Sequence, residues 1–198
     1  MAARGDSSDT APETPDSSDN LSAYRAKRSP DRSPEPVGTV SPVVGRLFVV
    51  HKHAARQLHF DLRLEMDGVL RSWAVPKGPS TDPRDKRLAM EVEDHPLAWG
   101  EFEGVIESGY GAGRVIVWDR GTYRPLSEDF ARALDDGHAS FWLEGQKLRG
   151  GWSLRRIRDG RKPQWLLVKR RDEAADARRR PTSTQPESVV SGRRIEDL

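Results

Sequence analysis

Residues 51–65 read HKHAARQLHFDLRLE, and this stretch decides the fold. From residue 58 onward, apolar and polar side chains alternate without a break. One parity holds Leu58, Phe60, Leu62 and Leu64, and the other holds His59, Asp61, Arg63 and Glu65. A period of two is typical of a β-strand with one face against an apolar core. The other face of this strand carries side chains suited to metal ions and phosphate.

The β pattern continues through residues 45–170, which form the predicted domain. Strands are expected over 47–51, 57–65, 70–75, 87–93, 114–119, 139–143, 147–157 and 164–170. Asp67-Gly68 supplies the positive φ of a tight hairpin turn. One short helix is expected over 127–136, with Ser127 as its N-cap. Eight short strands and one helix predict an all-β fold, either a small barrel or a sandwich.

The two ends of the chain differ in composition from this domain. Residues 1–22 are rich in Asp, Ser, Thr and Pro, and we expect a disordered acidic tail there. Residues 23–44 are proline-rich and predict an arm that packs against the domain in places. Residues 171–198 are polar, and we expect a flexible tail whose arginines are solvated or touch nucleic acid.

Composition excludes several classes of protein. The net charge of +2 does not by itself indicate a nucleic-acid binder. Cysteine is absent, which excludes disulfides, thiolate metal sites and cysteine nucleophiles. No apolar run approaches the roughly 18 residues that span a bilayer, and the N-terminus does not resemble a secretion signal. We therefore expect a soluble intracellular protein.

His59 and Asp61 are two residues apart on one face of the predicted strand, where their backbones lie about 6.5 Å apart. An imidazole and a carboxylate at that spacing can bind one metal ion. His53 would be about 20 Å from His59 in a continuous strand, so it can join them only if the chain turns near residues 54–56. Arg63, next along the face, is suited to bidentate phosphate contact. The competing interpretation is a solvated sheet face without a ligand.

Three further residues could contribute chemistry. His95 precedes Pro96, which restricts it to an extended backbone, and it could act as a general acid or donate to an oxyanion. A lone buried histidine more often satisfies a structural hydrogen bond. Lys77 follows a strand and Arg87 opens one, and a surface charge is the default interpretation for both.

Four motifs occur in order along the chain: His53-x5-His59-x-Asp61-x-Arg63, then WAVPKG at 73–78, EDHPL at 93–97 and VIVWDRG at 115–121. Together they resemble the 3′-phosphoesterase domain of the bacterial DNA ligase D end-joining system, over about residues 24–171. A ligase or polymerase module does not fit in 198 residues, so we expect the stand-alone form.

The resemblance implies a closed or partly closed β-barrel with one or two short helices. It implies an enzyme of DNA repair that removes a 3′-terminal ribonucleoside and then the 3′-phosphate, leaving a 3′-hydroxyl. The cofactor implied is Mn²⁺, with Co²⁺ or Zn²⁺ as alternatives. The implied partners are DNA or DNA/RNA 3′ ends, a separate DNA ligase and an end-binding protein. A monomer in the bacterial or archaeal cytoplasm, near the nucleoid and without a membrane, is expected.

The resemblance also assigns residues. The metal ligands would be His53, His59 and Asp61. The catalytic residues would be His95, Arg63, Lys77, Arg87 and Glu35, the last from the N-terminal arm. Arg63, His51 and Trp99 would contact substrate. Direct attack by water is the simplest mechanism, because no residue is an obvious covalent nucleophile.

The chain departs from the family pattern at four places. Trp99 replaces a tyrosine, Ser29 replaces an acid with Asp31 nearby, and His51 stands where glutamine is frequent. The loop before Tyr110 is one residue short. These departures bear on the monoesterase step more than on metal binding.

Two alternatives belong to other classes of protein. His59, Asp61 and His95 could form the facial triad of an Fe(II) oxygenase, which would leave His53 and Arg63 without a role. A non-catalytic DNA-repair module could keep the same barrel and bind partners only.

Overall fold

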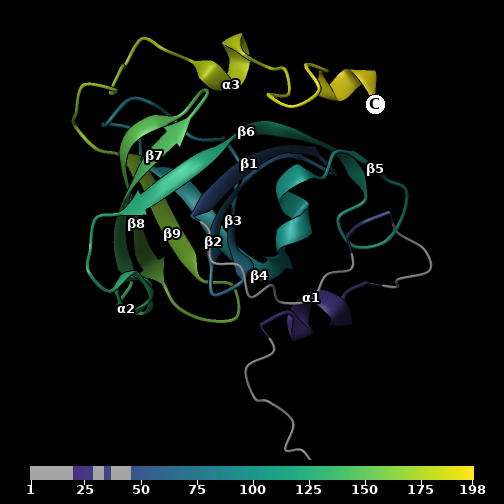
Figure 1. Cartoon of the computed structure of the whole chain (residues 1–198), viewed down its shortest axis with the longest axis horizontal. Coiled ribbons are helices and arrows are strands. Elements are labelled where there is room, and N and C mark those ends of the chain that lie inside the picture. Colours follow the sequence, from purple (N-terminus) through teal and green to yellow (C-terminus); the bar gives the residue numbers. More distant parts are fainter. Residues whose placement is uncertain (1–19, 29–33, 37–45) are drawn as a thin grey trace, which may run out of the picture.

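The computed structural model describes residues 20–28, 34–36 and 46–198. Within this part of the chain nine antiparallel strands form one sheet in the order β1-β2-β3-β4-β9-β8-β7-β6-β5. A further pairing of β1 with β6 closes eight of them into a barrel, and β5 pairs with β6 outside the closed ring (Figure 1). The predicted all-β barrel of about eight strands is therefore confirmed.

The strands are as follows: β1 (Leu47–Ala54), β2 (Leu58–Met66), β3 (Val69–Val75), β4 (Arg87–Pro96), β5 (Gly104–Ile106), β6 (Gly113–Pro125), β7 (His138–Gly145), β8 (Arg149–Arg158) and β9 (Gln164–Lys169). The helical segments are α1 (Ser22–Ala26), η2 (Leu97–Glu101), α2 (Phe130–Asp135), α3 (Pro181–Thr184) and η3 (Ile195–Asp197). No helix of the described residues is long and apolar enough to cross a membrane.

The alternating stretch forms β2, and its two faces lie against two different apolar clusters. Phe60, Leu62 and Leu64 point into the barrel and pack with residues such as Trp73 and Trp118. The odd positions face outward, on the side where a second cluster joins Tyr24, Trp99 and residues of β5 and β6. Asp61, Arg63 and Glu65 are consequently buried. The polar face is covered rather than solvated.

The turns follow the predicted chemistry, with two differences in the helices. Asp67 (φ 52°) and Gly68 (φ 77°) make the expected β2–β3 turn. Helix α2 begins later than predicted, because Asp129 rather than Ser127 accepts the backbone N–H of Arg132 and acts as the N-cap. Helix α1 was not predicted. It forms where Leu21 and Tyr24 are buried, although residues 20–22 belong to the stretch expected to be disordered.

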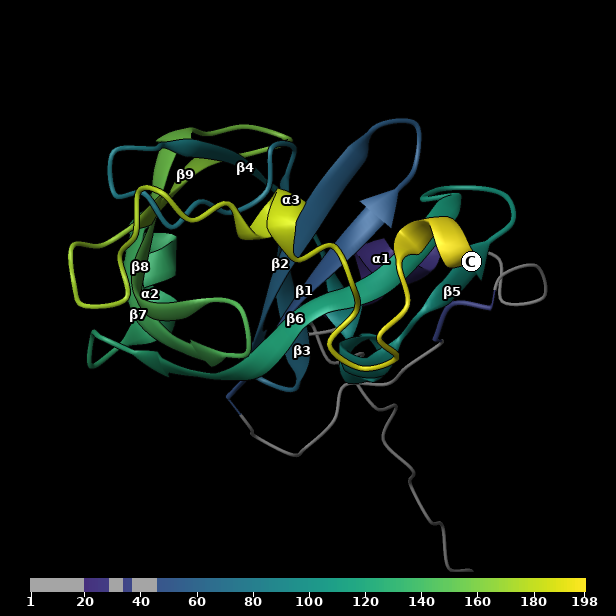
Figure 2. The same ribbon diagram turned by 90° about the horizontal axis from the view of Figure 1, so that it is seen from above.

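The C-terminal segment is ordered against the barrel, contrary to the predicted flexible tail over 171–198. The carbonyl of Gln185 accepts hydrogen bonds from the Trp118 indole (2.8 Å) and from Lys147 Nζ (2.9 Å). The backbone N–H of Val189 donates to the Val117 carbonyl (3.0 Å). Figure 2 shows the segment crossing the barrel beside β6 to the C-terminus. Composition did not reveal this, because several of these contacts use backbone groups, which composition does not report.

Deletion of residues 181–198 is expected to lower the free energy of unfolding by about 2 kcal/mol or more, since the buried Trp118 indole loses its acceptor. Urea unfolding followed by tryptophan fluorescence measures this. Arg178→Ala is the control, because that side chain is exposed and should leave the midpoint unchanged. An unchanged midpoint in the deletion variant would show that the segment is as loose as its composition suggests.

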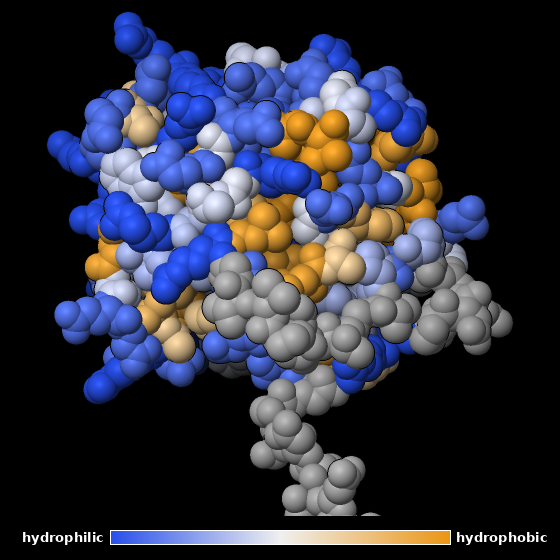
Figure 3. Space-filling view, in the orientation of Figure 1, coloured by the Kyte–Doolittle hydropathy of each residue, from blue (hydrophilic) through white to orange (hydrophobic). Residues whose placement is uncertain are grey.

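The outer surface carries mainly hydrophilic side chains. Figure 3 shows blue side chains over most of one face, with smaller apolar patches between them. Large apolar side chains are buried in two places, inside the barrel and in the second cluster outside it. The buried polar groups on the outer face of β1 and β2 lie on the side of that second cluster.

Candidate active site

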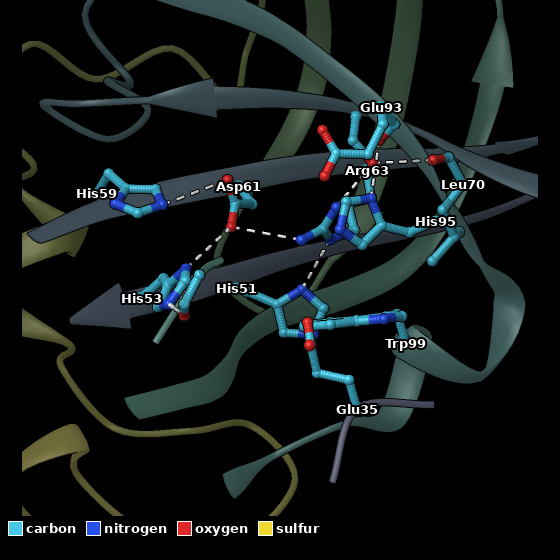
Figure 4. A network of polar contacts seen from close by, with 12 residues as sticks. Glu35, His51, His53, His59, Asp61, Arg63, Leu70, Glu93, His95 and Trp99 are labelled. Atoms are coloured by element: carbon cyan, nitrogen blue, oxygen red, sulfur yellow. Dashed lines mark hydrogen bonds and ion pairs between the residues drawn. The ribbon is translucent and has the colours of Figure 1, made fainter. Parts of the chain in front are cut away.

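Three ligand side chains converge at one end of β1 and β2. The strand register places His53 directly opposite His59, because the chain reverses at residues 55–57. His53 Nδ1 lies 3.7 Å from one oxygen of Asp61, and His59 Nε2 lies 3.6 Å from the other (Figure 4). One ligand atom from each residue lies within 4.8 Å of the others. The turn that the sequence required near residues 54–56 is present.

The second ring nitrogen of each imidazole is also engaged. His53 Nε2 lies 2.8 Å from the carbonyl of Gly111, and His59 Nδ1 lies 2.9 Å from the carbonyl of Gln57. A carbonyl only accepts, so these nitrogens carry the protons and the lone pairs of the other two face Asp61. Metal-binding histidines in proteins show this arrangement. The donor set of two imidazoles and one carboxylate fits a divalent cation with positions left open.

Arg63 adjoins this group and is only 3% exposed. Its Nη1 donates to Ser72 Oγ (2.8 Å), its Nε to His51 Nδ1 (3.2 Å) and its Nη2 to Asp61 (3.4 Å). The guanidinium also lies 5.1 Å from the Trp99 ring centroid. These contacts hold a buried cation in one orientation beside the ligand group.

The charges of the buried residues are set by this packing. Burial would raise the pKa of Asp61, but the Arg63 guanidinium holds the pKa of that carboxyl well below its usual range. Burial lowers the pKa of His51 to about 3, and Arg63 acts in the same direction. Asp61 is therefore an anion and His51 a neutral ring at neutral pH. His51 supports Arg63 and does not line the cavity, unlike the substrate contact expected for it.

His95 reaches the site from β4. Its Nδ1 lies 2.8 Å from the carbonyl of Glu93 and so carries the proton. Its Nε2 lies 3.4 Å from Nη2 of Arg28, a donor, and so accepts. Burial lowers the pKa of His95 well below its ordinary value, and Arg63 and Arg28 reinforce the shift. In this arrangement the ring positions Arg28 and has no proton on Nε2 to donate.

The thermal midpoint of the protein should fall as the pH drops below about 6.5, the ordinary pKa of histidine. The folded chain keeps His95 neutral while the unfolded chain binds a proton there, so protons favour unfolding over this range. His95→Gln removes the titrating group and should reduce the fall between pH 7.5 and 5.5, with the wild type as the control. The same slope in both proteins would contradict this assignment.

The N-terminal arm supplies two further charged groups. Arg28 Nε donates to Glu35 (2.9 Å) and its Nη1 to Glu93 (3.1 Å). The same guanidinium lies 3.8 Å from the Tyr24 ring centroid. Glu35 is thus brought to the site as expected. Arg28 was not predicted, because nothing in its local sequence relates it to β2. The one available signal was its position in the same arm as Glu35, which was predicted to reach the site.

Trp99 has a structural partner. Its indole N–H donates to Tyr24 Oη (2.8 Å), which in turn donates to the Pro36 carbonyl (2.8 Å). Trp99 therefore borders the cavity and ties the arm to η2, while its one donor is already used. Ser29 and Asp31, the other positions of interest in the arm, lie outside the described residues.

These groups surround a cavity of about 160 Å³. Its charged lining consists of two arginines and three carboxylates, and its histidines are three of the five in the chain. The lining includes Arg28, Glu35, His53, His59, Asp61, Arg63, Glu93, His95, Trp99 and Tyr110. With neutral imidazoles the net charge is minus one. A divalent cation would reverse that sign and make the cavity attractive to an anion.

Lys77 and Arg87 are not among the residues that line this cavity. Lys77 is exposed just after β3, and Arg87 begins β4 with its guanidinium 2.8 Å from Asp85. Both lie toward the same end of the barrel as His59, since Phe60 pairs with Val75. They stand outside the lining of the cavity, on the side of His59.

The oxygenase triad is not formed. Among the described residues, the group of three ligands contains His53 with His59 and Asp61, whereas His95 faces Arg28. Local spacing could not distinguish these alternatives, because His53 and His95 reach β2 only through strand pairing.

Comparisons with known proteins agree with the resemblance. The family model described as DNA Ligase D 3′-phosphoesterase domain matches residues 51–156, more than half of the chain. The chain is 49% identical over 186 residues to the multifunctional non-homologous end joining protein LigD of Pseudomonas aeruginosa, covering 90% of the chain and 22% of that protein. It is 44% identical over 151 residues to the corresponding LigD of Mycobacterium tuberculosis H37Rv, covering 75% and 19%. The chain thus spans about a fifth of the length of these relatives.

Proposed function

Because the chain belongs to the DNA ligase D 3′-phosphoesterase domain family, we propose that it is a metal-dependent phosphoesterase that repairs DNA 3′ ends. Its substrates are primer ends that carry a 3′-terminal ribonucleoside and, after that is removed, a 3′-phosphate. The product is a 3′-hydroxyl that a ligase can join. The observation that carries the proposal is the His53, His59 and Asp61 group beside the buried Arg63.

The cation is Mn²⁺, with Co²⁺ or Zn²⁺ as substitutes, held by His53, His59 and Asp61. When bound, it supplies Lewis acidity toward a phosphoryl oxygen and lowers the pKa of a coordinated water. Two imidazoles with one carboxylate and no thiolate suit a borderline cation of this kind. The cavity is negatively charged without a cation, and this charge also supports the proposal that a divalent cation is needed to bind phosphate.

The chain's own residues orient the phosphate. Arg63, held by Ser72 and His51, directs its guanidinium toward the oxygens on which charge develops. Arg28 provides a second cation from the N-terminal arm, held by Glu35, Glu93 and His95. His95 keeps Arg28 in place and becomes a donor only when an anion beside it raises its pKa.

Water is the proposed nucleophile. The lining of the described cavity contains no serine, threonine or cysteine that could form a covalent intermediate. Glu35 and Glu93 lie across the cavity and can accept a proton from that water, each while bound to Arg28. Lys77 and Arg87, outside the cavity, are proposed to contact the nucleic acid further along.

The decisive experiment incubates the purified protein with Mn²⁺ and a labelled primer-template that ends in one ribonucleotide. The expected result is a shortened product that ends in 3′-phosphate and then in 3′-hydroxyl, resolved by gel electrophoresis and blocked by EDTA. A second primer, made of deoxyribonucleotides only, is the control. Binding of Mn²⁺ without any processing of either primer would overturn the proposal and favour the partner-binding module.

The cellular setting follows from the same premise. We propose that the protein acts as a monomer in the cytoplasm, together with a separate DNA ligase and a protein that binds DNA ends. Gel filtration of the protein, alone and with a DNA duplex, would measure whether it is a monomer.

A further inference from the structure

A second hollow opens directly beside the candidate metal group. It is lined by two chain reversals: residues 55–57 between β1 and β2, together with His59, and residues 109–112 before β6. Four residues line both this hollow and the cavity described above: Ala55, His59, Tyr110 and Gly111. The two spaces are therefore continuous, with His59 at their boundary. A molecule held at the metal would extend into this hollow.

The lining of the hollow differs in charge from that of the cavity. None of its eight residues is a carboxylate, and Arg56 contributes an exposed cation. The remaining lining residues are small, apart from Gln57, His59 and Tyr110. Such a surface suits a flat, uncharged group attached to an anion more than it suits a second metal or a cation.

Tyr110 is the one aromatic residue between these two reversals, and it is 50% exposed. The other two tyrosines, Tyr24 and Tyr123, are buried. Its loop is shaped by glycines with positive φ on both sides, Gly109 (90°) and Gly111 (82°). Lys27 Nζ lies 4.7 Å from the ring centroid and the Arg28 guanidinium carbon 5.7 Å from it, so cations of the arm contact the ring while half of the residue stays exposed. An exposed aromatic ring held at the edge of a site offers a stacking face to a base.

The same loop also orients a candidate ligand. The carbonyl of Gly111 lies 2.8 Å from His53 Nε2, so the residue after Tyr110 sets the direction of the His53 ring. Tyr110 directly precedes Gly111, so the contact between Gly111 and His53 also holds the Tyr110 backbone close to the metal group. A nucleoside stacked there would have its phosphate on the side of His59.

We infer that Tyr110 is a specificity residue whose ring stacks on the terminal nucleoside, the one that leaves when the phosphodiester is cut. This inference rests on the proposed function and adds the place where the leaving group binds. Two short reversals border the hollow, and Tyr110 is the aromatic side chain there that can stack on one base. The duplex and the upstream strand then lie on the other side of the metal group.

The test compares two primer-templates that differ only at the 3′ end, one ending in a ribonucleoside and one in a 3′-phosphate. Tyr110→Ala should lower kcat/KM for the ribonucleoside end about ten-fold or more, as loss of one stacked base predicts. The 3′-phosphate end has no leaving nucleoside. The kcat/KM for removal of that 3′-phosphate should therefore change less than about two-fold. Tyr110→Phe is the matched variant and should behave as the wild type.

Each other outcome has a defined meaning. Equal losses for both ends would overturn the inference, because the ring would then serve the upstream strand or the loop itself. No loss for either end would overturn it as well. Mn²⁺ affinity measured by calorimetry should be the same in all three proteins, which separates stacking from displacement of His53. If the wild type processes neither primer, the proposed function fails and not this inference alone.

Discussion

Replacement of His59 by alanine is expected to lower the phosphoesterase rate at least about a thousand-fold, which corresponds to about 4 kcal/mol of transition-state stabilisation. His59 contributes one of three donor atoms that lie within 4.8 Å of one another, and a two-residue remnant binds divalent ions poorly. Steady-state cleavage of the ribonucleotide-ended primer measures the rate. Titration calorimetry with Mn²⁺ measures the loss of affinity that should accompany it.

The stability of this variant should change little. The His59 side chain is 23% exposed, and Asp61 keeps Arg63 and His53 as neighbours when His59 is removed. His138→Ala is the control, because that histidine is exposed at the start of β7 and does not line the cavity. Retention of the wild-type rate by His59→Ala would exclude the metal group as the catalytic centre.

Replacement of Arg63 by alanine should lower both activity and stability. The buried carboxylate of Asp61 would lose the cation that lowers its pKa, and removal of one partner from a buried pair costs about 3–5 kcal/mol. Thermal unfolding should shift down by roughly 10 °C for a chain of this length. Arg63→Lys should recover only part of the activity, because an ammonium cannot replace three differently directed N–H donors.

A double variant isolates the cause of that destabilisation. Asp61→Asn in the Arg63→Ala background removes the unpaired charge and should recover part of the lost stability. Arg132→Ala is the control, since this arginine of α2 is mostly exposed and pairs with Asp136 only at 3.7 Å. Simple additivity of the Asp61 and Arg63 effects would mean that the two residues do not stabilise each other.

Much of the barrel could be predicted because strand formation depends on local periodicity. The alternation of residues 58–65 places Phe60 and Leu62 in the core, and the Asp67-Gly68 turn follows from the φ values that these residues tolerate. Strand β5 was not predicted. It has three residues, Gly104–Ile106, which is too short a span for a period to be seen. Strand β1 was underestimated, since it continues beyond the predicted end at residue 51 through His53 to Ala54.

Some features of the site could likewise be predicted from the sequence, and others could not. The spacing of His59, Asp61 and Arg63 on one strand face was readable, because residues two apart on a strand are neighbours. The roles of His51 and Trp99 were not readable. His51 accepts from Arg63 on the neighbouring strand, and Trp99 donates to Tyr24 in the N-terminal arm, and neither pairing shows in the local sequence. The sequence also did not show that Lys77 and Arg87 lie outside the lining of the cavity, since the order of motifs carries no distance.

The sequence by itself determined an all-β chain, the family and a strand with two histidines, an aspartate and an arginine at workable spacing. Tertiary structure alone decided that His53 faces His59, that the arm brings Arg28 and Glu35 over the polar face, and that the C-terminal segment packs on the barrel. The physical reason is the distance along the chain over which each kind of interaction acts. Periodicity and turn chemistry act between neighbours in the chain, whereas burial of Asp61 and Arg63, and the charges that follow from it, depends on residues from Tyr24 to Tyr110 folding onto one another.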